Sequence, residues 1–132
     1  MFRKMLRAKI HHATVTQADL DYVGSITIDE DLLRASGLRP NEAVQVLDLD
    51  NGARLETYVF RGEPGSGVIG INGAAAHLVK VGHRVIIVCY GHLTEEQLDD
   101  HVATVVVVDQ DNRVAKVLHH DSRLDQPAAT VQ

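Results

Sequence analysis

The chain has 132 residues and a mass of 14.5 kDa, which fits one domain with a single hydrophobic core. Its 45% apolar and 23% charged residues exclude a disordered chain, and a net charge of −5 with only 4% aromatic residues argues against binding to nucleic acid. The chain has no apolar run of the roughly 18 residues that a membrane span needs and no signal-peptide pattern, so it is not expected at a membrane. The single Cys89 suits a reducing compartment, and the chain is therefore expected in the cytoplasm.

The first third of the chain predicts two strands and one short helix. Strands are expected at residues 6–16 and 23–28, where β-branched residues are frequent. Asp29 is a typical helix N-cap and Gly37 a typical C-terminal stop. Together they predict a helix over residues 30–36.

The clearest local signal in the chain is a β-hairpin. The Asn-Gly pair at residues 51–52 separates two strand-like runs, at 44–49 and 54–60. Side chains alternate between the two faces of a strand. Thr57 and Tyr58 should therefore point to opposite faces unless a bulge intervenes.

The second half of the chain predicts four more strands and two short helical segments, the first of them capped by Asn72. The strands are expected at residues 68–71, 85–89, 102–108 and 114–118, and the helical segments at 73–77 and 94–98. Many short strands with little helix predict a small, mainly-β barrel. We expect a single domain over residues 1–118 and a flexible tail at 119–132.

Two patterns that resemble known sites have simpler interpretations. Residues 65–70 spell G-x-G-x-x-G, but a dinucleotide site needs that motif to open a long helix after a strand, so we interpret it as a glycine-rich loop. The eight histidines show no metal-ligand spacing, and no metal is expected. The pairs at 11–12 and 119–120 should face opposite ways on their strands.

The Gly24-Ser25 pair allows two interpretations. A β-bulge or a turn would account for it. Alternatively, the Ser25 hydroxyl attacks the preceding carbonyl, which glycine favours because it tolerates unusual backbone angles. The two residues alone do not decide between these alternatives.

A family resemblance favours self-cleavage. Residues 5–11, 14–29, 51–58 and 65–77 resemble the pyruvoyl-dependent aspartate 1-decarboxylases, most specifically in Tyr-Val-Gly-Ser at 22–25 and Asn-Gly-Ala-Ala-Ala-His at 72–77. The resemblance extends over residues 1 to about 110. It implies a six-stranded double-psi β-barrel with short helices, a homotetramer, and cleavage into a β chain (residues 1–24) and an α chain (25–132). The implied reaction converts L-aspartate to β-alanine and CO₂ for pantothenate, a coenzyme A precursor.

The resemblance also assigns roles in the chemistry. Ser25 attacks the Gly24 carbonyl with Thr57 as hydrogen-bond donor, and it becomes a covalent pyruvoyl group, so neither a metal nor pyridoxal phosphate is required. The pyruvoyl group forms a Schiff base with aspartate and accepts the electrons released as CO₂ leaves. Tyr58 is the expected proton donor, since a phenol is protonated at neutral pH.

The implied substrate site combines cations with a loop of small residues. Lys9 and Arg54 match the two carboxylates of aspartate, and exposed backbone N–H groups in the loop fit an anion. The expected contacts are Lys9, Arg54, Thr57, Gly73, Ala74 and Ala75. His11, Tyr22 and Asn72 are expected to support the site, although ordinary packing or capping explains each of them equally well.

Three alternatives to this function stay open from the sequence. One is a non-catalytic barrel and another a DNA-binding barrel, which the acidic charge and the presence of Ser25, Thr57 and Tyr58 disfavour. The third is a pyruvoyl decarboxylase for another amino acid, which would not need both Lys9 and Arg54. The sequence also leaves open a separate maturation factor for the cleavage.

Overall fold

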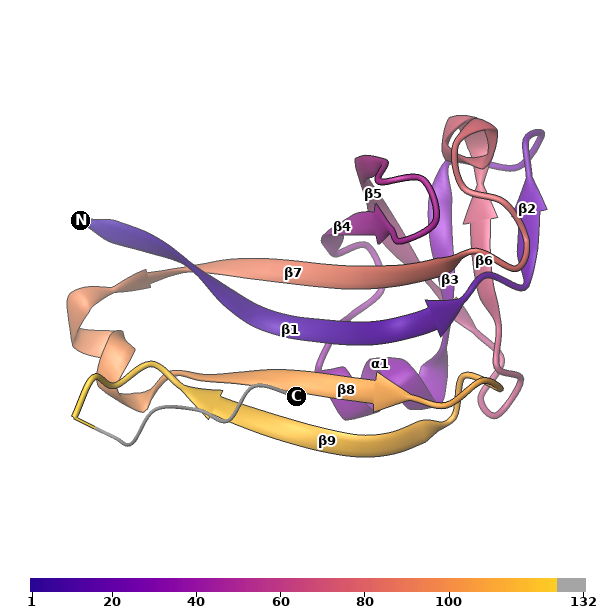
Figure 1. Cartoon of the computed structure of the whole chain (residues 1–132). Helices are drawn as coiled ribbons and strands as arrows, with labels where there is room; N and C mark the ends of the chain where they lie inside the picture. Colours follow the sequence, from indigo (N-terminus) through magenta and orange to yellow (C-terminus); the bar gives the residue numbers. More distant parts are fainter. Residues whose placement is uncertain (126–132) are drawn as a thin grey trace.

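The computed structural model describes residues 1–125, which form mainly β-strands with three short helices (Figure 1). The strands are β1 (Phe2–Thr14), β2 (Gln17–Asp19), β3 (Ser25–Asp29), β4 (Ala43–Asp48), β5 (Arg54–Gly62), β6 (Ile69–Asn72), β7 (Arg84–Thr94), β8 (Val102–Val108) and β9 (Val114–Asp121). The helices are α1 (Glu30–Ser36) and the 3₁₀ helices η1 (Gly73–His77) and η2 (Glu95–Asp100). The predicted mainly-β class with short helices is confirmed.

The strands follow one another in the order β2-β6-β3-β5-β4-β7-β1-β8-β9. Figure 1 shows β1, β7, β8 and β9 as long ribbons that extend to one side, and η2 lies at their far end. Strands β2 to β6 form the other side, where the candidate site lies. In the part of the chain that is described there are nine strands in this order, and the six-stranded double-psi arrangement stays a prediction.

The core is formed by aliphatic side chains from strands throughout the sheet. Each such side chain contributes roughly 1.5–3 kcal/mol when it is fully removed from water. Among the largest with no exposed surface are Ile10, Ile26, Ile28, Val46, Val59, Ile69, Ile71 and Ile87. Inward-facing residues of β3 and β6 therefore hold in place the strands that carry Ser25 and Asn72.

Local sequence explains helix α1 as predicted. Asp29 caps it, because its Oδ1 accepts a hydrogen bond from the Asp31 N–H at 2.8 Å. Gly37 ends it in a left-handed conformation with φ of 82°, and its N–H donates to the Leu33 carbonyl at 2.8 Å. The helix thus begins and ends at the expected residues.

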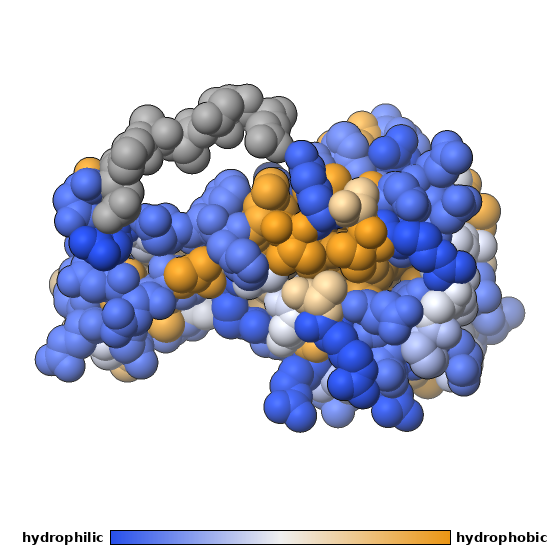
Figure 2. Space-filling model, turned by 90° about the horizontal axis from the view of Figure 1, so that it is seen from below, coloured by the Kyte–Doolittle hydropathy of each residue, from blue (hydrophilic) through white to orange (hydrophobic). Residues whose placement is uncertain are grey.

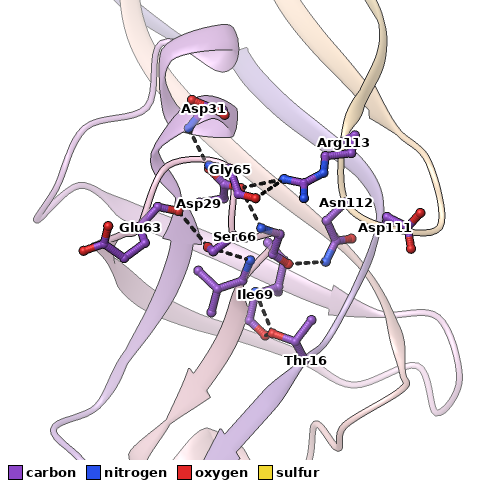
Figure 3. Close-up of polar contacts among 12 residues, drawn as sticks. Thr16, Asp29, Asp31, Glu63, Gly65, Ser66, Ile69, Asp111, Asn112 and Arg113 are labelled. Atoms are coloured by element: carbon purple, nitrogen blue, oxygen red, sulfur yellow. Dashed lines mark hydrogen bonds and ion pairs between the residues drawn. The ribbon is translucent and has the colours of Figure 1, made fainter.

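The Asp29 carboxylate also organises the glycine-rich loop (Figure 3). It accepts the N–H of Gly65 at 3.1 Å and the N–H of Gly67 at 2.8 Å. Asn112, in the turn between β8 and β9, donates to the Gly67 carbonyl at 2.8 Å, and Arg113 donates to the Gly65 carbonyl. The N–H groups that a phosphate would need are therefore bonded to a carboxylate of the chain itself.

Several elements differ from the expected ones in their limits. β1 begins at Phe2, four residues before the expected start, and β2 was not expected. β9 continues to Asp121, so residues 119–121 of the expected tail belong to the sheet, where His119 pairs with Thr104. The end of that tail, residues 126–132, lies outside the described residues. Among residues 1–125, none of the helices is long and apolar enough to cross a membrane.

Candidate active site

Ser25 is the first residue of β3 and is completely buried. Its hydroxyl donates a hydrogen bond to the Val23 carbonyl at 3.1 Å. The same oxygen accepts a hydrogen bond from Nδ2 of Asn72 at 2.9 Å. A buried hydroxyl next to the Gly24 carbonyl is thus held by two fixed partners on its oxygen, which is the arrangement a positioned nucleophile needs.

Asn72 contacts Ser25 because β3 and β6 are antiparallel and these two residues are direct partners. Asn72 was expected to cap the following helical turn. It occupies the N-cap position of η1, but its side chain makes no capping hydrogen bond there. Its amide points to the Ser25 hydroxyl instead. The capping interpretation of its side chain is therefore wrong, and Asn72 has a direct contact with the candidate nucleophile.

Gly73 brings the loop of small residues against the candidate cleavage site. Its φ is +76°, and a Cβ there would lie 2.7 Å from the Cα of Gly24. Any larger residue at position 73 would collide with the segment that precedes Ser25. Gly24 itself lies outside the left-handed region, and a Cβ there would meet nothing within 4 Å. Unusual backbone geometry is thus required at Gly73 and not at Gly24, contrary to expectation.

Tyr58 and Thr57 reach the site through β5, which is parallel to β3. Ile26 pairs with Val59, and continuing this register by one residue places Tyr58 beside Ser25. The same register places Thr57 beside Gly24. The β4–β5 ladder has no register shift in this region, so Thr57 and Tyr58 lie on opposite faces of β5.

Three aromatic rings form a row next to the start of β3. The ring of Phe60 lies edge-on to Tyr58, with centroids 5.6 Å apart, and edge-on to Tyr22, with centroids 6.2 Å apart. Both distances are typical of favourable aromatic pairs. Phe60 therefore helps to place Tyr58, a role that the sequence analysis missed although Phe60 follows Tyr58 by two residues on the same face.

The two predicted cations lie away from Ser25, Arg54 at the far end of the neighbouring strand β5 and Lys9 on the more distant strand β1. Arg54 shares a face of β5 with Tyr58, but the two residues are four positions apart along the strand, roughly 13 Å. Lys9 is on β1, where it pairs with Val88 and Val105. Within residues 1–125, no hydrogen bond or ion pair joins Lys9 or Arg54 to Ser25. The chain thus brings together Ser25, Asn72, Gly73 and Tyr58, but does not place the two cations against them.

His11 and His12 do not face opposite ways, as a regular strand would require. The register of β1 shifts between Ile10 and Ala13, and His12 has a φ of 65°. This bulge stacks the two rings with centroids 3.9 Å apart. His11 Nδ1 is buried without a hydrogen-bond partner among the described residues. Burial lowers the pKa of His11, and the positive charges of His12, Lys9 and Arg84 lower it further.

This lowered pKa predicts a pH-dependent stability. The unfolded chain protonates His11 near the ordinary histidine pKa of about 6.5, whereas the folded chain protonates it at lower pH. Protons then favour the unfolded state, so His11 reduces stability as the pH falls below about 6.5. We expect the melting temperature of His11→Gln to decrease less than that of wild type between pH 7.5 and pH 5.5. The decrease in His92→Gln, a variant at an exposed position on β7, should equal that of wild type. Equal losses in His11→Gln and wild type would contradict this assignment.

A cluster of one histidine and two aspartates was not apparent from the spacing of these residues in the sequence. His83 Nδ1 lies 2.7 Å from Asp48 Oδ2, and His83 Nε2 lies 3.9 Å from Asp50 Oδ2. These side chains offer ligand atoms within 4.8 Å of one another, so the three residues have the composition of a metal site. They also join the loop after η1 to the β4–β5 hairpin, as does Asn51, which donates to the Leu78 carbonyl at 2.8 Å. The absence of a metal stays a prediction.

Known proteins resemble this chain over nearly its whole length. The family model for aspartate decarboxylase matches residues 1–115. Three curated aspartate 1-decarboxylases are each 56% identical to this chain over 118 residues. They come from Bacillus cereus (strain B4264), Bacillus thuringiensis (strain Al Hakam) and Bacillus anthracis (strain CDC 684 / NRRL 3495). These matches cover 89% of this chain and 93% of each relative. The matched region of the family model contains every residue of the candidate site.

Proposed function

This chain belongs to the aspartate decarboxylase family, and from that premise we propose that it decarboxylates L-aspartate with a pyruvoyl group made from its own Ser25. The product is β-alanine, which serves the synthesis of pantothenate. The observation that carries the proposal is the Ser25 hydroxyl, which is buried next to the Gly24 carbonyl and held by Val23 and Asn72. A serine in these surroundings fits the conversion, since its oxygen is positioned and a donor already contacts it.

Self-cleavage comes first in this proposal. The Ser25 oxygen forms a bond to the Gly24 carbonyl carbon, the C–N bond breaks, and the hydroxyl proton passes to the amine of residue 25. The oxyanion formed on the way needs a fixed donor. Thr57 is the proposed one, because it precedes Val59 by two residues as Gly24 precedes Ile26, the partner of Val59. Elimination of the resulting ester leaves dehydroalanine at position 25, and water then hydrolyses its imine form, which releases ammonia and leaves a ketone. The products are the chains 1–24 and 25–132.

The chain's own residues then bind and orient aspartate and move its proton. The pyruvoyl group, once formed, supplies a carbonyl that accepts electrons as CO₂ leaves. Tyr58 holds the proton that is delivered to the substrate carbon; in support of this role, it directly precedes Val59, the strand partner of Ile26, as Ser25 directly precedes Ile26. Phe60 packs edge-on to its ring and limits the directions the phenol can take, and Tyr22 packs in turn against Phe60.

Substrate recognition is assigned to two cations and one loop. Arg54 and Lys9 bind the carboxylates, of which one must stay held while the other departs. Gly73, Ala74 and Ala75 form the wall next to the cleavage site, because Gly73 closely approaches Gly24. Glutamate, which is one methylene longer than aspartate, is expected to fit this wall less well.

Replacing Arg54 with lysine tests the role of its guanidinium. Lys keeps the charge but loses bidentate pairing with a carboxylate, so we expect kcat/KM for aspartate to fall about 10- to 100-fold. Cleavage of the chain should be unaffected. The matched control is Arg61→Lys, which changes an exposed arginine of the same strand that pairs with Glu30 at 3.6 Å. An unchanged kcat/KM in Arg54→Lys would remove Arg54 from the substrate site.

The function is tested by incubating the purified protein with L-aspartate, without added pyridoxal phosphate, and measuring β-alanine and CO₂. We expect both products in equal amounts and none from other amino acids. Borohydride treatment before the assay should abolish activity, since it reduces a ketone. Activity that depends on pyridoxal phosphate or survives borohydride would contradict the pyruvoyl proposal.

We also propose that the processed chains assemble into a homotetramer in the cytoplasm. Figure 2 shows an apolar area on the face seen from below, bordered by hydrophilic residues. β9 ends the sheet order, and it exposes Val114 and Val117. Exposed apolar surface of this kind supports burial against other copies. Assembly would also allow Lys9 and Arg54 of one copy to approach Ser25 of another. Light scattering should give a mass four times 14.5 kDa, and a monomer would contradict the assembly.

A further inference from the structure

The Asn72 amide contacts a second hydroxyl besides that of Ser25. Ser25 and Thr27 lie two residues apart on the same face of β3, and Asn72 pairs directly with Ser25 across the ladder. Nδ2 of Asn72 donates to Ser25 Oγ at 2.9 Å and to Thr27 Oγ1 at 3.1 Å. Both hydrogens of the NH₂ group are therefore used. The two hydrogens lie in the plane of the amide. Two acceptors therefore fix the orientation of this plane, whereas a single acceptor would let it rotate.

The side chain of Thr27 is held by packing on both neighbouring strands. Glycines stand next to it at Gly62 on β5 and at Gly70 on β6. A Cβ at Gly62 would lie 3.1 Å from the Thr27 methyl, and a Cβ at Gly70 would lie 3.4 Å from the Thr27 Cβ. The methyl therefore occupies the space beside Gly62, and the hydroxyl points to Asn72. A β-branched side chain packed in this way has little freedom about χ1.

We propose that Thr27 is a positioning residue for self-cleavage, which acts by fixing the Asn72 N–H on the Ser25 oxygen. This inference rests on the proposed cleavage between Gly24 and Ser25. Thr27 itself does not touch the bond that breaks. Its effect passes through Asn72, which is 6% exposed and so is also shielded from competing water.

The contact matters most in the step after the ester has formed. The Ser25 proton is directed to Val23 and one lone pair to Asn72, which leaves the other lone pair to attack Gly24. In the elimination that follows, a water molecule takes the Cα proton of residue 25. The Cβ–Oγ bond then breaks, and its electron pair stays on the oxygen as the carboxylate of Gly24. A fixed N–H on that oxygen stabilises the developing negative charge.

Thr27→Val tests this, because valine keeps the shape and the packed methyl but removes the hydroxyl. We expect cleavage, followed by mass spectrometry of freshly made chain, to slow about tenfold, or about 1.4 kcal/mol of activation free energy. The ester should accumulate and be detected as chain that denaturant with hydroxylamine splits between residues 24 and 25. Thr27→Ser should restore the rate, whereas Thr27→Ala should not. This second pair differs only in the hydroxyl and covers the case in which valine disturbs folding.

A double variant separates positioning from general destabilisation. In an Asn72→Ala background, Thr27→Val should cause no further slowing, because the contact it supports is already gone. Thr104→Val on β8 makes the same chemical change outside the site and should cleave like wild type. If wild type cleaves and Thr27→Val cleaves equally fast, or if Thr27→Ser is as slow as Thr27→Ala, the positioning role is wrong while the proposed function stands. If wild type does not cleave, the proposed function itself fails.

Discussion

With alanine in place of Ser25, we expect the chain to stay in one piece and to release no CO₂ from aspartate. Alanine has no oxygen to attack Gly24, and without that attack no ketone can form at position 25. The loss should be complete and not partial, since both the cleavage and the electron-accepting group depend on one atom. Intact mass and the aspartate assay on the same sample measure both effects.

The Ser25→Ala chain should nevertheless fold. It loses the hydrogen bonds to Val23 and Asn72, which costs about 1 kcal/mol for each bond, while the buried strand around it is unchanged. Ser66→Ala is the matched control, because it removes a serine hydroxyl from the glycine-rich loop, where that hydroxyl donates to the Glu63 carbonyl. Cleavage between residues 24 and 25 in the Ser25→Ala chain would contradict the assignment of the nucleophile.

The second large effect is expected at Tyr58. Tyr58→Phe keeps the ring and its edge-on contact with Phe60 but removes the proton, so the chain should cleave normally and then turn over aspartate about 10²- to 10⁴-fold more slowly. The slowing should be in kcat, because the proton moves only after the substrate is bound. Steady-state kinetics on fully cleaved protein measure this directly.

Tyr90→Phe provides the comparison for Tyr58→Phe. Tyr90 lies on β7, where Lys4 Nζ is 4.9 Å from the centroid of its ring, a contact that phenylalanine retains. Its variant should cleave and turn over like wild type. A Tyr58→Phe enzyme with unchanged kcat would exclude Tyr58 as proton donor, and a block in cleavage would assign Tyr58 to processing instead.

Local signals predicted the elements whose ends depend on one or two residues. Asp29 and Gly37 gave the limits of α1, and the Asn-Gly pair at 51–52 gave the β4–β5 hairpin. The ends of strands that depend on pairing with distant strands were less predictable. The start of β1 is largely exposed and shows no apolar alternation, yet it is a strand because it pairs with the end of β7, where Phe2 meets Thr94.

The candidate site shows the same division. The family resemblance pointed to Ser25 and Tyr58, but only the parallel register of β3 and β5 explains why they lie together. The contact of Asn72 with Ser25 depends on strand pairing 47 residues apart, so a capping role looked equally reasonable from the sequence. The stacked rings of His11 and His12 depend on a bulge, which no local pattern marks.

Intact mass spectrometry of the denatured protein is the most direct test of self-cleavage at Ser25. We expect two chains of roughly 3 and roughly 12 kDa from the 14.5 kDa precursor. The larger should be lighter, by one ammonia, than a chain that begins with a free serine, and it should react as a ketone. A single intact chain that persists after prolonged warming, with cell extract added to supply any maturation factor, would contradict self-cleavage at Ser25 and the catalytic mechanism built on it.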